Sequence, residues 1–198
     1  MKKLFLSSAF LVLLSVGAFA QDFRLGVKAG PMLSNFTGRD LTSGYRLAAH
    51  AGLVADCSIN SRFSVQPELL FSLKGDRNDG FGTTERTNLS YLDVPVLLKV
   101  KTGGFFLEAG PQIGWRLSGK YKVNNVSLKV TDNYRTLDYG YAAGLGYQLS
   151  NGLNAGLRYN AGFRDPINEN PILPGSGFSA KGHNSVFQFY IGYLLPGV

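Results

Sequence analysis

The sequence predicts an all-β fold: an eight-stranded antiparallel up-and-down β-barrel that crosses a membrane. Three observations lead to this prediction. Eight segments alternate between apolar and polar residues, short and long polar connections alternate between them, and one face of every segment lacks charge. Side chains along a β-strand point alternately to opposite faces, so each segment has one apolar and one polar face. Segments of about 9 to 13 residues suit a tilted transmembrane strand.

The first residues of the 198-residue chain have the layout of a secretory signal. Lys2 and Lys3 precede an apolar stretch, which ends in the small-x-small sequence of residues 18–20. A transmembrane helix is the alternative, but the apolar run is short and no basic stop-transfer cluster follows it. We therefore expect residues 1–20 to be a cleaved signal peptide and residues 21–198 to form a single outer-membrane β-barrel domain.

Composition narrows the class of protein further. Cys57 is the only cysteine, so no internal disulfide can form. The formal charge is +7, but the basic residues are dispersed along an exported chain, so we expect no nucleic-acid partner. Beyond the signal there is no apolar stretch long enough for a helical span, and many short alternating runs favour strands.

The predicted strands cover residues 23–30, 45–59, 62–75, 88–100, 105–119, 137–149, 153–164 and 185–195. Tight turns at 60–61, 102–104 and 150–152 contain Gly or Asn, which accept the positive φ that hairpins need. Longer polar segments lie at about 36–44, 75–87, 119–136 and 166–184. Short turns at one end and long loops at the other are typical of outer-membrane barrels, with both termini at the periplasmic end.

Charge distinguishes the two faces of the predicted strands. The apolar face carries large residues such as Phe63, Leu107 and Leu157 and, over the regular part of all eight strands, no charged residue. The polar face carries both signs of charge and most of the strand glycines. Its basic residues are Arg24, Lys28, Arg46, Lys74, Lys99, Arg116, Arg158 and Arg164, and its acidic residues are Asp56, Glu68, Asp93, Glu108 and Asp138.

Two architectures fit this alternation. In a soluble lipocalin-like barrel the apolar face would surround an apolar ligand, whereas in a membrane barrel it would contact lipid. Glycines on the charged face favour the membrane barrel, because long charged side chains need room in a narrow lumen. A closed barrel also leaves no unpaired edge in hydrocarbon. The aromatic residues near strand ends resemble the girdles at lipid interfaces: Tyr45, Tyr91, Phe105, Trp115, Tyr139, Phe163 and Tyr193.

A charged lumen has two expected consequences. Buried charges must be paired or hydrogen bonded, so we expect an internal salt-bridge network. Eight strands leave an interior that side chains just fill, so the barrel should be plugged and should not pass solutes as a large porin does. Separately, Pro67, Pro95 and Pro111 lie within predicted strands, where a missing ladder donor predicts local bulges.

Several segments resemble a known family in the order in which they occur. Residues 24–31, RLGVKAGP, are similar to the G-x-K-x-G first strand of the PorT-like porin family, small outer-membrane barrels of Bacteroidetes. Residues 91–100, YLDVPVLLKV, resemble its Tyr-Leu-(Glu/Asp)-(Ile/Val)-Pro-(Leu/Val)-Leu-x-Lys run, and four later segments follow in order. Pro31-Met32 and the terminal Pro196-Gly197-Val198 depart from the usual pattern. Members include a factor needed for type IX protein secretion, so the resemblance implies an accessory secretion role as an alternative function.

One pair of residues suggests catalysis. His183 and Ser185 stand two apart where the last long segment enters the final strand, so both would lie on the apolar face, beside lipid. A lipid-modifying barrel enzyme would need such a nucleophile pair. We favour the alternative of a loop histidine and a strand-start serine, because His-x-Ser is a common triplet.

Two further features have simpler interpretations. We expect His50, on the charged face, to be a lumenal hydrogen-bond partner. The segment 75–85 is expected to be an exposed turn-rich loop, since it has Phe81 where a Ca²⁺ loop requires glycine.

The sequence thus predicts a monomeric, non-enzymatic outer-membrane barrel with no cofactor and no metal. Outer-membrane lipid surrounds it, and its role is structural or interactive. Four long external loops, or turns that meet periplasmic or secretion-machinery proteins, would carry that role.

Overall fold

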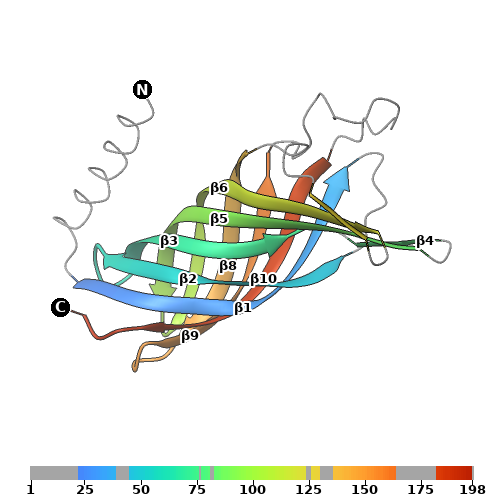
Figure 1. The fold of residues 1–198 in the computed structure, drawn as a ribbon. Helices are drawn as coiled ribbons and strands as arrows, with labels where there is room; N and C mark the ends of the chain where they lie inside the picture. Colours follow the sequence, from blue (N-terminus) through green and yellow to red (C-terminus); the bar gives the residue numbers. More distant parts are fainter. Residues whose placement is uncertain are drawn as a thin grey trace.

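The computed structural model of the protein is a closed antiparallel β-barrel (Figure 1). It describes residues 22–38, 45–75, 77–80, 83–123, 126–129, 136–163 and 182–197. The barrel strands are β1 (Asp22–Gly38), β2 (Arg46–Ser58), β3 (Phe63–Lys74), β5 (Thr83–Thr102), β6 (Phe105–Val123), β8 (Leu137–Gln148), β9 (Leu153–Gly162) and β10 (Gly182–Leu194). Two short strands, β4 (Arg77–Gly80) and β7 (Val126–Lys129), add to β5 and β6. The predicted signal peptide lies outside the described residues.

Hydrogen-bonded ladders close the barrel. Every neighbouring pair of strands is antiparallel, and β1 pairs with both β2 and the last strand, β10. Pairing of β5 with β6 completes the ring, so eight strands surround the lumen as predicted. The described part of the chain contains no helix that is long and apolar enough to cross a membrane.

The predicted tight turns are confirmed. Gly103 and Gly104, between β5 and β6, have φ of 54° and 88°, and Gly152, between β8 and β9, has φ of 92°. Between β2 and β3, the Asn60 Oδ1 atom accepts hydrogen bonds from the backbone N–H groups of Arg62 (2.9 Å) and Phe63 (2.8 Å). These turns lie at the same end of the barrel as the start of β1 and the end of β10 (Figure 1).

The apolar face of the strands forms the outer wall of the barrel. Leu107 of β6 is 62% exposed and Ile191 of β10 is 65% exposed, whereas Glu108 and Arg158, each next to an exposed leucine in sequence, are buried. This arrangement contradicts the lipocalin-like alternative, in which the apolar face would surround the axis.

Tyr91 is an exception to the predicted aromatic girdle. Its side chain is 0% exposed and lies in the lumen, where the Lys74 ammonium is 4.5 Å from its ring centroid. It shares strand parity with Asp93 and Lys99, which are also buried, so the alternation itself places it inside. The other predicted girdle residues are exposed on the outer wall: Tyr45, Phe105, Trp115, Tyr139, Phe163 and Tyr193.

The expected proline bulges are absent from the described strands. The register is the same on both sides of Pro67, Pro95 and Pro111. A proline removes one N–H donor, and the paired residues around it hold the ladder in place. A register shift occurs elsewhere, between Ser90 and Tyr91 of β5, where β6 contains one extra residue, Leu117.

The segment predicted as a turn-rich loop at 75–85 contains strand structure. β4 pairs with the first residues of β5, and β7 pairs with the last residues of β6. We call this four-stranded extension the rim sheet: β4, residues 83–88 of β5, residues 119–123 of β6, and β7. It projects beyond the barrel at the end opposite the tight turns (Figure 1).

Candidate functional site: a charge network across the lumen

The polar face of the strands lines the lumen, as predicted. The buried charged residues are Lys28, Asp56, Glu68, Lys74, Asp93, Lys99, Glu108, Arg116, Asp138 and Arg158. Arg24 and Arg46 are partly exposed near the two ends, and Arg164 lies outside the described residues. Charges buried at this density are tolerated only when they are paired and hydrogen bonded.

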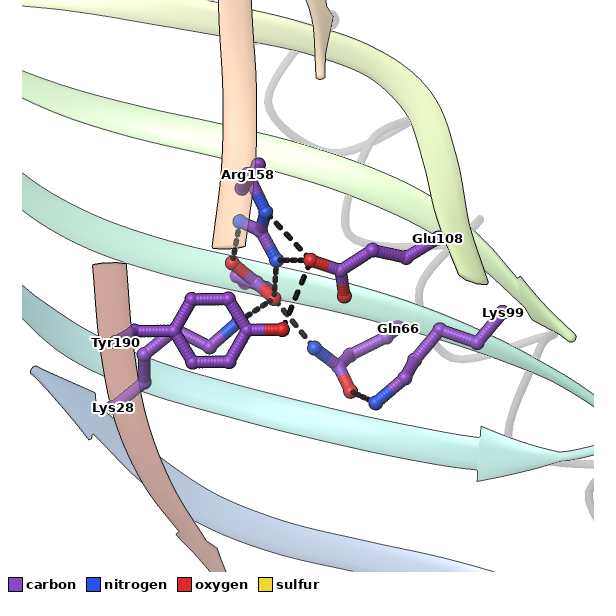
Figure 2. A network of polar contacts seen from close by, with 7 residues as sticks. Lys28, Gln66, Lys99, Glu108, Arg158 and Tyr190 are labelled. Atoms are coloured by element: carbon purple, nitrogen blue, oxygen red, sulfur yellow. Dashed lines mark hydrogen bonds and ion pairs between the residues drawn. The ribbon is translucent and has the colours of Figure 1, made fainter. Parts of the chain in front are cut away.

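Arg158 of β9 occupies the centre of the lumen and is fully buried (Figure 2). Its Nη1 and Nη2 atoms donate hydrogen bonds to the two carboxylate oxygens of Glu68, at 2.7 and 2.9 Å. Its Nε atom donates to Glu108 Oε1 at 2.8 Å. Glu68 lies on β3 and Glu108 on β6, and neither strand neighbours β9 in the barrel. One guanidinium therefore ties together three separate parts of the wall.

Glu68 is the second centre of the network. In addition to Arg158, its Oε1 atom accepts hydrogen bonds from Lys28 Nζ at 2.8 Å and from Gln66 Nε2. The Gln66 Oε1 atom in turn accepts a hydrogen bond from Lys99 Nζ at 3.0 Å. A single carboxylate is thus surrounded by donors on β1, β3 and β9.

Aromatic rings complete the network, which has more cations than carboxylates. The Tyr190 hydroxyl donates to Glu108 Oε1 at 3.0 Å, and the Lys28 ammonium lies 3.8 Å from the Tyr190 ring centroid. The Lys99 ammonium lies 3.8 Å from the Phe106 ring centroid. The negative face of an aromatic ring stabilises a cation, so these rings compensate for the missing carboxylate. We call the central network the set Lys28, Gln66, Glu68, Lys99, Glu108, Arg158 and Tyr190.

Glycine makes room for these side chains. A Cβ atom added at Gly156 would lie 2.5 Å from the Tyr190 ring, and one at Gly114 would lie 2.5 Å from Asp93 Oδ1. Real Cβ atoms do not approach other heavy atoms that closely, so a larger residue at either position would displace a lumenal side chain. The expectation that strand glycines accommodate a crowded lumen is supported at both positions.

Smaller polar clusters lie on either side of the central network. Toward the loop end, Lys74 Nζ pairs with Asp93 Oδ1 at 2.8 Å, and Asn184 Nδ2 donates to Asp138 Oδ2 at 2.7 Å. A small polar cavity at that end is lined in part by Lys74, Gln112, Asp138, Asn160 and Asn184. Toward the turn end, Lys101 Nζ pairs with Asp56 Oδ2 at 2.9 Å. The predicted internal salt-bridge network is therefore present.

His50 lies inside the lumen, where the alternation places it, and is 3% exposed. Neither ring nitrogen has a hydrogen-bond partner among the described residues, so the predicted hydrogen-bonding role is not found. The two carboxylates of the central network are not free to accept a hydrogen bond from His50, because Arg158 binds both of them and Lys28 also binds Glu68.

His183 and Ser185 both lie in β10 and share the parity of its outward face, as predicted, but Ser185 is only 6% exposed and therefore does not lie open to lipid. The Ser185 hydroxyl is 3.2 Å from the Tyr159 hydroxyl, with which it forms a hydrogen bond. The His183 side chain is exposed, and the described residues give it no hydrogen bond or ion pair. A nucleophile pair needs the serine bonded to the base and the base oriented by an acid. The described contacts of this pair do not supply either bond.

Among the described residues, no cluster of three or more His, Cys, Asp or Glu side chains is arranged to hold a metal ion. The expectations of no metal and no cofactor stay predictions.

A closed barrel with an apolar wall and a charged interior defines a transmembrane β-barrel protein. Residues 19–168 match the outer membrane protein beta-barrel domain family, and the chain belongs to that family. It is therefore a protein of the outer membrane. No curated protein matches the chain in sequence.

Solved structures share the fold at low sequence identity. Neisserial surface protein A is 11% identical with a TM-score of 0.52, and the match covers 85% of this chain and 96% of that one. The attachment invasion locus protein Ail of Yersinia pestis, solved with the heparin analogue sucrose octasulfate, is 10% identical with a TM-score of 0.51. That match covers 88% of this chain and all of Ail. At these identities the similarity concerns the fold alone.

Proposed function

We propose that this protein is a monomeric, non-enzymatic outer-membrane barrel whose lumen is closed to solutes and whose role is structural or interactive. The central network carries the proposal. Arg158 of β9 binds carboxylates of two strands that do not neighbour β9, and the side chains of Lys28, Glu68 and Arg158 are at most 2% exposed. Breaking a buried ion pair costs about 3–5 kcal/mol, so these side chains do not move aside readily. With the interior occupied, the two ends of the barrel are left to contact partners.

Electrical recordings test whether the lumen is closed. The native protein, reconstituted in planar lipid bilayers, is expected to give no stable conductance steps above the bare bilayer. A variant with Lys28, Glu68, Glu108 and Arg158 all replaced by alanine should conduct, because it empties the centre of the lumen and removes two cations together with the two carboxylates that pair with them. Porin-like steps from the native protein would contradict a closed lumen. A large porin recorded in the same bilayers confirms that the assay detects open channels.

A strain lacking the gene tests the two alternative functions together. We expect the mass spectrum of its lipid A to be unchanged, since the described contacts of His183 and Ser185 lack those of a nucleophile pair. A missing lipid A modification that His183→Ala reproduces would establish the enzyme instead. The accessory role in type IX secretion rests on the family resemblance, and normal secretion of cargo in the same strain would rule it out.

Two finer assignments belong to the same proposal. The layout of residues 1–20 supports export with removal of a signal peptide. The segment at residues 91–100 supports placement of the chain among the PorT-like barrels of Bacteroidetes, within the broader family. The partners that we propose are the surrounding lipid and proteins of the periplasm or the secretion machinery.

A further inference from the structure

Four side chains with imidazole, hydroxyl or amide groups lie in the lumen between the central network and the loop end. Each is at most 3% exposed, and we call them the polar layer: His50, Ser72, Asn160 and Gln188. Asn160 follows Arg158 by two residues along β9, and Gln188 precedes Tyr190 by two residues along β10. Both steps lead toward the loop end, because the two strands are antiparallel. Two residues of a strand tilted by about 40° rise roughly 5 Å along the barrel axis.

The strand register places the other two members of the polar layer at a similar level. His50 of β2 is paired with Gly30 of β1, which follows Lys28 by two residues toward the loop end. Ser72 of β3 is paired directly with His50. The polar layer therefore lies next to the central network, on its loop side, and draws its members from β2, β3, β9 and β10.

The polar groups of this layer have no protein partner. Both ring nitrogens of His50, the Ser72 hydroxyl and both amide atoms of Asn160 and of Gln188 lack a hydrogen-bond partner among the described residues. One unpaired buried polar group lowers the folding equilibrium constant roughly 5- to 150-fold. Seven such atoms would together cancel most or all of the stability of a typical domain. These groups therefore need a ligand small enough to enter the lumen.

The small polar cavity at the loop end reaches the polar layer, because Asn160 belongs to both. Its volume is about 10 Å³, close to what one water molecule needs. Asp138 also lines it, and the Oδ1 atom of this buried carboxylate has no partner among the described residues. Gly162 keeps the cavity open, since a Cβ atom there would lie 3.1 Å from that oxygen. The cavity thus combines room for a water molecule with the two or more polar partners that a buried water requires.

The mixture of donors and acceptors distinguishes water from a small ion. The amides of Asn160 and Gln188 each present one donor nitrogen and one acceptor oxygen, and a neutral imidazole such as that of His50 also has one of each. An anion would satisfy the donors alone, and a cation the acceptors alone. Lys74 lines the same cavity, and its ammonium opposes a cation beside Asp138. Water donates and accepts, so it fits the whole set.

From these contacts we propose that the polar layer is a water-binding site, filled from the loop end through the cavity beside Asn160. Water molecules there form hydrogen bonds with the imidazole, hydroxyl and amide groups of the layer. The loop side of the lumen is then hydrated as far as Arg158. The inference holds whether or not ions pass the central network, which the bilayer recordings test separately.

Nuclear magnetic resonance of the histidine ring tests the proposal on the folded full chain in lipid bilayers. The chain has two histidines, so His183→Gln leaves His50 as the only site of a ¹⁵N-histidine label. Magnetisation is expected to pass from water protons to the His50 ring nitrogens. In the same background, Ser72→Val/Asn160→Leu/Gln188→Leu removes the other polar groups of the layer. The transfer from water should then be lost.

Stability gives a second measurement, which does not need the triple variant to fold. Gln188→Met keeps the length of the side chain and removes its amide. If water satisfies that amide, the folding equilibrium constant from urea unfolding in lipid vesicles should not rise. The matched control Gln66→Met removes an amide that is hydrogen bonded to Glu68 and Lys99, and it should lower the constant.

Three results would overturn the proposal. The first is that no magnetisation passes from water to His50 in the chain with an intact polar layer. The second is that the triple variant, shown to be folded by heat-dependent electrophoretic mobility, keeps the full transfer. The third is a roughly 5- to 150-fold rise in the folding equilibrium constant of Gln188→Met, which would mean that the native amide is unpaired.

Discussion

Replacing Arg158 with alanine is expected to destabilise the folded barrel by about 3–5 kcal/mol. Arg158 is fully buried and supplies three hydrogen bonds of 2.7–2.9 Å to Glu68 and Glu108. Its removal leaves both carboxylates in the lumen without their main counter-charge. Whole domains are stable by only about 5–15 kcal/mol, so this loss is a large fraction of the free energy of unfolding. Urea unfolding in lipid vesicles, followed by tryptophan fluorescence, measures the loss.

A compensated variant separates lost pairing from lost packing. Arg158→Met combined with Lys28→Met, Glu68→Gln and Glu108→Gln removes two cations and two carboxylates and keeps side chains of similar length. Its stability should exceed that of Arg158→Ala, because neither carboxylate is left in the lumen without its counter-charge. The exposed Arg62→Ala serves as the surface control and should change stability by less than about 0.5 kcal/mol. The role of Arg158 as the centre of the network is refuted if Arg158→Ala unfolds at the same urea concentration as the native protein.

The variant Leu157→Arg is expected to destabilise the barrel by about 2–4 kcal/mol, the cost of an arginine facing lipid near the bilayer midplane. Leu157 is exposed on the outer wall in the middle of β9, between Leu145 and Phe189 on the neighbouring strands. The native arginine, Arg158, is the next residue and faces the lumen. Positions 157 and 158 therefore lie at nearly the same depth in the membrane but on opposite sides of the barrel wall. The same unfolding measurement applies.

A second position on the outer wall, close to one end of the barrel, serves as the control for Leu157→Arg. Tyr45 lies on the outer wall at the rim and is 56% exposed. Tyr45→Arg should cost only about 0–1 kcal/mol, because charge near the interface is tolerated. Equal costs at the two positions would mean that the outer wall does not contact hydrocarbon at residue 157.

Most of the fold follows from alternation in the sequence. The charge-free face of each segment predicts the outer wall, and the same count places Glu108 and Arg158 inside. The same alternation also predicts which aromatic side chains lie in the lumen, because Tyr190 has the parity of Gln188 and Phe106 has that of Glu108. The position of an aromatic residue near a strand end is a weaker guide. Tyr91 was assigned to the girdle on that basis, but its parity places it in the lumen, where it is found.

The partners within the lumen could not be predicted from the sequence. Arg158 and Glu68 are 90 residues apart, and they meet because the stagger of the strands brings them to one level of the barrel. The bulge in β6 contains no proline, so the shift that places Gly119 on the buried side could not be predicted either. β4 and β7 are four residues each, too short to give a periodic signal.

Pairing of the first strand with the last sets an order on biogenesis. Lys28 comes from β1 and Tyr190 from β10, so the contact between them needs the whole polypeptide to be present. Until the C-terminal segment is in place, the acids and bases along the axis stay hydrated and an open seam faces the surroundings. A chain truncated before residue 182 would lack β10, so β1 and β9 would have no partner strand between them and the barrel would stay open instead of closing into a smaller one.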